Sequence, residues 1–149
     1  TKLLLAALPD HAYFGAKDAQ QVAVIRRFVA DLGIPVTLVV CPTSRDADGL
    51  ARSSRNTRLS PDERAQALAI PHALQDVMDA AASGIADTAA LRARALATLE
   101  ASSIRPEYVA FVDPITFAAA PTVDGPVLVA IAARVGSTRL IDNTVLGGA

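Results

Sequence analysis

The chain has 149 residues, of which 52% are hydrophobic and only 4% aromatic, and it carries a net charge of −1. A compact chain of this length buries roughly 70% of its extended surface. We therefore expect a core of small aliphatic residues, in one ordinary domain or two small ones. The charge argues against nucleic acid as the main partner, because binding a phosphate backbone needs a basic excess.

The single cysteine, Cys41, excludes an intrachain disulfide and fits a reducing compartment. Together with two widely separated histidines it offers no zinc-binding pattern. The longest apolar runs are far shorter than the ~20 residues of a membrane span. These features predict a cytoplasmic protein.

Residues 12–40 predict a strand–helix–strand unit. A short apolar strand at 12–14 is closed by Gly15, and the apolar run at 36–40 is typical of a parallel-sheet strand with both faces covered. The helix between them ends at Gly33, a glycine that can adopt the left-handed conformation after a helix. Its apolar face, at spacings of three and four, consists of Val22, Ile25, Phe28, Val29 and Leu32. The pattern indicates one right-handed βαβ crossover.

A first polar segment follows the first of these strands, at the strand end where ligands bind in parallel sheets. Lys17 lies there, just before a helix N-terminus whose dipole favours anions. Asp18 and Gln21 have the spacing of a capping box, in which both side chains bind the first backbone N–H groups of the helix. That structural role competes with ligand binding, most directly for Gln21.

A second polar segment, residues 45–56, follows the second strand and is expected at the same sheet edge. It combines a glycine, several arginines and the adjacent hydroxyls of Ser53 and Ser54. Hydroxyls, backbone N–H groups and planar guanidinium groups suit phosphate oxygens, so one interpretation is a loop that closes on a polyphosphate. The alternative is a solvated loop whose arginines pair with Asp46 and Asp48.

Two helices are predicted next. Ser60-Pro61-Asp62-Glu63 is a strong helix start, with a serine cap, a proline in the first position and a glutamate in the third. This helix is predicted to reach about Ser83 with a kink at Pro71, because proline removes a helix hydrogen bond. A second helix, capped by Asp87 or Thr88, runs to about residue 101.

Three strands end the chain, at 108–112, 127–133 and 138–142. The last two are joined by a two-residue hairpin turn. The sequence thus predicts an α/β protein with two domains, residues 1–59 around a parallel βαβ unit and residues 60–149 as a small α+β lid with a three-stranded antiparallel sheet.

Two motifs resemble those of a known family. Residues 14–21, Phe-Gly-Ala-Lys-Asp-Ala-Gln-Gln, resemble the FGxKDxQQ motif of the pantothenate synthetases, or pantoate–β-alanine ligases. Residues 48–56, Asp-Gly-Leu-Ala-Arg-Ser-Ser-Arg-Asn, resemble their DGLAxSSRN loop. The motifs stand in the family's order, and residues 127–130 and 138–143 resemble its C-terminal strands.

The resemblance implies a partial Rossmann-like domain of the nucleotidylyltransferase and class I synthetase type. It also implies an ATP- and Mg²⁺-dependent ligase: pantoate and ATP form pantoyl adenylate and pyrophosphate, and β-alanine then displaces AMP to give pantothenate. The implied partners are these small molecules and, in the complete protein, a second copy in a homodimer.

The resemblance also assigns residue roles. The implied catalytic groups, which close on the ATP phosphates, are Lys17, Ser53, Ser54 and Arg55. Gln21 is implied to bind pantoate. No metal ligand is implied among them. Gly15 and Asp18 are implied to lie against the ribose of ATP. The full set implied to bind ATP is Gly15, Lys17, Asp18, Ser44, Arg52, Ser53, Ser54 and Arg55.

The sequence departs from the family in three ways. Arg52 replaces a usually apolar residue, which we expect to alter packing beside adenine, and Ala16 replaces a commonly charged one. The family's His-x-Gly-His motif does not occur, and we expect it to precede Thr1 in a longer natural chain. His11 and His72 have the wrong neighbours to replace it and are interpreted as structural.

We therefore expect negligible ligation by these 149 residues alone, although the complete protein is predicted to be an enzyme. The alternatives are a non-catalytic nucleotide-binding module and a fragment that oligomerises through an open strand edge.

Overall fold

The computed structural model describes residues 1–148, so Ala149 lies outside it. It contains two compact units, one spanning Thr1–Ser44 and one beginning at Arg45. The domains expected from the sequence, 1–59 and 60–149, stay a prediction. No helix within residues 1–148 is long and apolar enough to cross a membrane.

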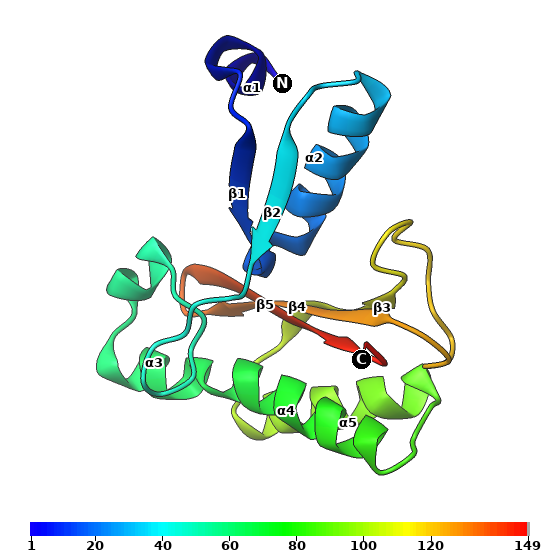
Figure 1. The fold of residues 1–149 in the computed structure, drawn as a ribbon. Helices are drawn as coiled ribbons and strands as arrows, with labels where there is room; N and C mark the ends of the chain where they lie inside the picture. The colour runs from blue at the N-terminus through cyan, green and yellow to red at the C-terminus, as the bar shows by residue number, and fades with distance from the viewer. Residues whose placement is uncertain (149) are drawn as a thin grey trace. The chain divides into compact units, whose positions relative to one another are not determined.

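The first unit is a strand–helix–strand arrangement, as predicted (Figure 1). Its two strands are parallel, in a register that runs from the pair His11 and Thr37 to the pair Gly15 and Cys41. The run at 36–40 was predicted to be covered on both faces. The residues of β2 are instead half-buried or exposed, because the sheet of this unit has only two strands. The elements are α1 (Lys2–Ala7), β1 (His11–Gly15), the 3₁₀ helix η1 (Ala16–Asp18), α2 (Ala19–Asp31) and β2 (Thr37–Cys41).

The two ends of α2 differ in how well the sequence predicted them. Gly33 has a φ of +58°, and the N–H of Ile34 donates to the carbonyl of Val29 at 3.0 Å, so the glycine-terminated end is confirmed. Asp18 is the N-cap residue, but its side chain forms no capping hydrogen bond, so the predicted capping box is wrong. The reason is the backbone: η1 precedes the helix and holds Asp18 at φ −94° and ψ 60°, outside the extended conformation typical of a capping residue.

In the second unit, the segment predicted as one kinked helix forms two. The first ends before Leu68, and Pro71 lies in the first turn of the next, where a missing N–H breaks no helix hydrogen bond. The predicted capping box is confirmed: Ser60 Oγ accepts from the N–H of Glu63 at 3.2 Å, and Glu63 Oε2 accepts from the N–H of Ser60 at 2.8 Å. The helices are η2 (Ser54–Arg58), α3 (Pro61–Ala67), α4 (Ala69–Ala82) and α5 (Thr88–Ala101).

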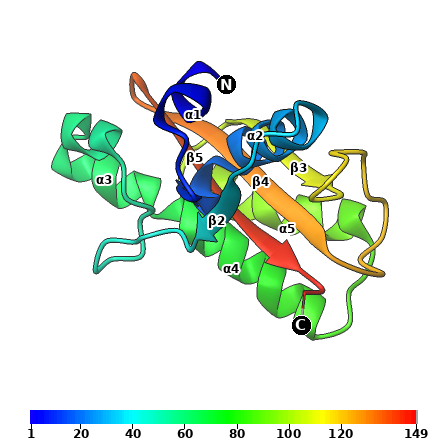
Figure 2. The ribbon, with the colours of Figure 1, turned by 45° about the horizontal axis from the view of Figure 1, so that its top comes forward.

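The three predicted strands form one antiparallel sheet in the order β3-β4-β5, and α4 and α5 cover one face of it (Figure 2). The strands are β3 (Pro106–Val112), β4 (Val127–Val135) and β5 (Thr138–Leu146). Gly136 has a φ of +55°, which the tight hairpin between β4 and β5 requires. Fully buried side chains between helices and sheet include Ile70, Leu74, Val77, Leu91, Leu99, Phe111, Val129 and Ile131.

Candidate functional site

The predicted residues of the first unit lie near the carboxyl ends of its two parallel strands. Gly15 ends β1 and is paired in register with Cys41, which ends β2. Lys17 follows in η1 and is half-buried, and Asp18 is exposed at the start of α2. The capping alternative fails in the structure, so the Asp18 carboxylate is not engaged at the helix end.

Two further candidates complete this group. Gln21 is exposed in the first turn of α2, and Ser44 follows β2 by three residues. Because β1 and β2 are parallel, both strands end at the same edge of this two-stranded sheet.

The polar loop of the second unit begins as a short hairpin. Arg45 and Ala51 face each other in an antiparallel bridge, and the N–H of Asp46 donates to the carbonyl of Leu50 at 2.9 Å. Gly49 makes the turn with a φ of +90°. Leu50 and Ala51 are only 3% and 4% exposed, so apolar burial fixes this otherwise polar segment.

A partly buried ion pair attaches the hairpin to the sheet. Arg45 donates from Nη1 and Nη2 to the two carboxylate oxygens of Asp142, at 2.6 and 3.1 Å. Asp142 lies in β5 and is 3% exposed, and its Oδ1 also accepts from the N–H of Asn143 at 2.8 Å. A bidentate pair of this kind fixes both position and direction of the guanidinium.

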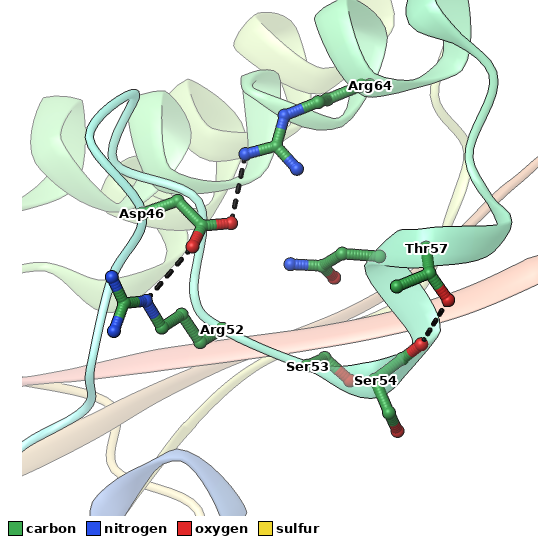
Figure 3. A pocket seen from close by; sticks show the side chains of 7 residues that line it. Asp46, Arg52, Ser53, Ser54, Thr57 and Arg64 are labelled. Carbon is green, nitrogen blue, oxygen red and sulfur yellow. Dashed lines mark hydrogen bonds and ion pairs between the residues drawn. The ribbon is translucent and has the colours of Figure 1, made fainter.

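Two further arginines bind the carboxylates of the hairpin, and Figure 3 shows both of them at Asp46. Asp46 accepts from Arg64 Nη2 at 2.9 Å and from Arg52 Nε at 3.0 Å, one bond to each oxygen. Asp48 accepts from Arg64 Nε at 2.9 Å. The hydrogen bond from Arg64, and next that from Arg52, hold the pKa of the Asp46 carboxyl below its ordinary value.

The Ser-Ser-Arg segment, residues 53–55, differs from the hairpin in the partners of its side chains. Ser53 caps η2, with its Oγ accepting from the N–H of Arg55 at 3.2 Å, and Thr57 Oγ1 donates to the carbonyl of Ser54 at 2.9 Å. The Arg55 side chain is exposed and forms no hydrogen bond or ion pair within residues 1–148. The predicted alternative, arginines neutralised by Asp46 and Asp48, therefore describes Arg52 but not Arg55.

Asn56, the last residue of the second motif, is 9% exposed. Its Nδ2 donates to the carbonyl of Ala51 at 3.2 Å, which ties η2 to the end of the hairpin. Its Oδ1 is buried without a hydrogen-bond partner in the described part of the chain. Such an orphaned acceptor is uncommon and destabilises the loop conformation that contains it.

An open pocket of about 520 Å³ lies within the second unit (Figure 3). Of the predicted site, Arg52, Ser53 and Ser54 line it. Asp46 was expected only as an ion-pair partner of the loop arginines, and no role was predicted for Asn56, Thr57 or Arg64. Of these three, Asn56 belongs to the second motif, which was the available signal. The full lining is Asp46, Arg52, Ser53, Ser54, Asn56, Thr57 and Arg64.

Guanidinium and hydroxyl donors of this kind can bind an oxyanion such as a phosphate. They do not form a metal site: residues 1–148 contain no group of three or more His, Cys, Asp or Glu side chains placed to hold a metal ion.

Comparison with known proteins identifies the family. The sequence model of pantoate-beta-alanine ligase matches residues 1–145. The pantothenate synthetase of Agrobacterium fabrum is 49% identical over 149 residues, which cover 99% of this chain and 51% of that protein. That of Thermobifida fusca is 52% identical, over 97% of this chain and 50% of the relative. The chain thus spans about half the length of these relatives.

Comparison with solved structures identifies the same family. A crystal structure of pantothenate synthetase from Thermus thermophilus superposes with a TM-score of 0.91 at 40% identity, covering 96% of this chain and 52% of that one. A Francisella tularensis pantoate-beta-alanine ligase, complexed with beta-gamma ATP and beta-alanine, gives a TM-score of 0.68 at 28% identity, over 97% and 46%. From its sequence and its α/β fold, the chain belongs to the pantoate–β-alanine ligase family.

Proposed function

We propose that the protein condenses pantoate with β-alanine at the expense of ATP, through pantoyl adenylate, and that these residues supply part of its ATP and pantoate sites. Family membership supports the reaction. The main support for assigning the reaction to this site is which of its arginines form ion pairs. Arg45, Arg52 and Arg64 are each paired with a carboxylate, whereas Arg55 stands unpaired beside two hydroxyls among the described residues.

The chemistry suits these groups. A carboxylate oxygen of pantoate attacks the α-phosphorus of ATP, the bond to the bridging oxygen breaks, and pyrophosphate leaves with the negative charge. Fixed cations and N–H or O–H donors that face this charge lower the barrier. We assign this role to Lys17 and to Ser53, Ser54 and Arg55. In the second step the β-alanine amine attacks the acyl carbon, AMP leaves, and the amine loses a proton.

Substrate binding completes the proposal. Gln21 hydrogen-bonds pantoate, Gly15 and Asp18 contact the ribose, and Ser44 and Arg52 contact ATP elsewhere. Mg²⁺ enters bound to the ATP phosphates, since Mg²⁺ is commonly held by substrate phosphates with few protein ligands. The same family resemblance supports a Rossmann-like first domain, a homodimer and a cytoplasmic location.

Calorimetric titration of the full-length protein tests the assignment. Arg55→Ala should weaken MgATP binding about tenfold or more, as expected for the loss of a charge-assisted hydrogen bond, and leave pantoate binding unchanged. Gln21→Ala should do the reverse. Arg58→Ala is the matched control, because Arg58 is an exposed arginine of the same short helix to which we assign no role.

Equal losses for both ligands in either variant would contradict the residue assignment. A wild-type protein that binds MgATP but forms no pantothenate from pantoate and β-alanine would instead indicate a nucleotide-binding module without ligase activity.

A further inference from the structure

Arg64 joins two carboxylates of the polar loop. It projects from α3 and donates from Nε to Asp48 and from Nη2 to Asp46, both at 2.9 Å. The helix that carries it is held at its start by the capping box of Ser60 and Glu63. Arg64 thereby closes residues 46–64 into a ring around the pocket that Ser53 and Ser54 also line (Figure 3).

The charges of this ring balance. Asp46 and Asp48 contribute two negative charges, and Arg52 and Arg64 contribute two positive ones. Asp46 has both arginines as partners, whereas the ion pair of Asp48 is with Arg64. Losing the Arg64 charge would therefore leave Asp48 uncompensated, in the hairpin just before Ser53, Ser54 and Arg55.

We propose that Arg64 is a positioning residue for nucleotide binding: it neutralises Asp46 and Asp48 and so keeps the Arg55 guanidinium available for the phosphates of ATP. This inference rests on the proposed function of the loop. A carboxylate released beside the loop would both attract Arg55 and repel the polyanion. If Arg64 had only a structural role in holding the ring closed, MgATP binding would not depend on the charge of Asp48.

The two roles are separated by a rescue experiment. Arg64→Gln removes the charge and is expected to weaken MgATP binding about tenfold, the effect of one uncompensated charge near the bound nucleotide. Arg64→Lys keeps the charge and should retain most of the affinity. Adding Asp48→Asn to Arg64→Gln removes the uncompensated carboxylate, while its amide oxygen can still accept from the N–H of Leu50, and should restore binding to within about threefold of wild type.

A single Asp48→Asn variant provides an independent test should Arg64→Gln fail to fold. It leaves the ring with one surplus positive charge, so MgATP should bind several-fold more tightly, and pantoate should bind as before. Unchanged or weaker MgATP binding in this variant, or no rescue in the double variant, would overturn the role of Arg64 while the proposed function stood. A wild-type protein that binds no MgATP would overturn both.

Discussion

Removing the Asp142 carboxylate should loosen the base of the polar loop and the sheet beneath it. The carboxylate accepts three hydrogen bonds, two from Arg45 at 2.6 and 3.1 Å and one from the backbone of Asn143 at 2.8 Å. Asp142→Ala removes all three acceptors and leaves a guanidinium without its counter-charge. Arg45 would keep its hydrogen bond to the carbonyl of Gly49, at 3.1 Å, which carries no compensating charge.

The magnitude follows from burial. Breaking a fully buried ion pair by removing one partner destabilises a protein by about 3–5 kcal/mol. The Asp142 side chain is 2% exposed, but that of Arg45 is 35% exposed, and water can solvate the remaining cation. We therefore expect a loss of about 2–3 kcal/mol in the free energy of opening the β4–β5 pair, which corresponds to a factor of roughly 30 to 150.

Native-state hydrogen exchange measures this quantity locally, which matters because the chain contains two compact units. The backbone amides of β4 and β5 should exchange faster by that factor in Asp142→Ala. The matched control is Asp31→Ala, which breaks the equally short but solvated pair with Arg27, at 2.7 Å, and should change exchange in α2 little.

Replacing both partners, with Arg45→Met and Asp142→Leu together, should recover most of the protection, because the penalty lies in the unpaired charge. An acceleration below about fivefold in Asp142→Ala would refute the argument that burial makes this pair structurally important.

Three further outcomes are expected. Asp46 has a lowered pKa, first because of the hydrogen bond from Arg64, so its ionised form adds stability at pH values above its unfolded pKa of about 3.9. That stability is lost as pH falls through the lower folded value, and Asp46→Asn should flatten the acid limb of thermal unfolding below about pH 4. Gly136→Ala should lower the free energy of unfolding by about 1–2 kcal/mol in urea titrations, because the new Cβ would collide with the Glu63 carboxylate at a positive φ. Leu99→Ala, at a fully buried position, should lower it by about 2–5 kcal/mol, and a loss below about 1 kcal/mol would mean that the helices repack.

Local signals predicted most of the fold. The helix that starts at Ser60 and the helix end at Gly33 are confirmed because capping chemistry involves residues adjacent in sequence. Apolar runs and a glycine turn likewise predicted the three-stranded sheet. The break at Leu68 was missed because proline suggested a kink at Pro71, and a first-turn proline cannot be told from an internal one until the preceding helix end is known.

The site was harder to predict than the fold, because its organisation depends on pairs distant in sequence. The motif indicated the hydroxyls and arginines of the loop, but no pattern links Arg45 to Asp142, 97 residues away. The two bonds of Arg64 span 16 and 18 residues and were missed for the same reason. The sequence alone left two interpretations of the loop open, since the number of arginines says nothing about which of them are paired.

Arg52, the residue that departs from the family motif, shows how these pairings preserve the loop. Its side chain is 64% exposed and donates to Asp46 Oδ1, while Arg64 donates to Oδ2 of the same carboxylate. Arg52 and Arg64 thus bind different oxygens of one carboxylate, so both guanidinium groups pair with it at the same time. With Arg52 present, the charges of Asp46, Asp48, Arg52 and Arg64 balance, so this group adds no net charge to the loop before Arg55. An arginine in place of the usual apolar residue is therefore compatible with the anion-binding role that we propose for the segment after it.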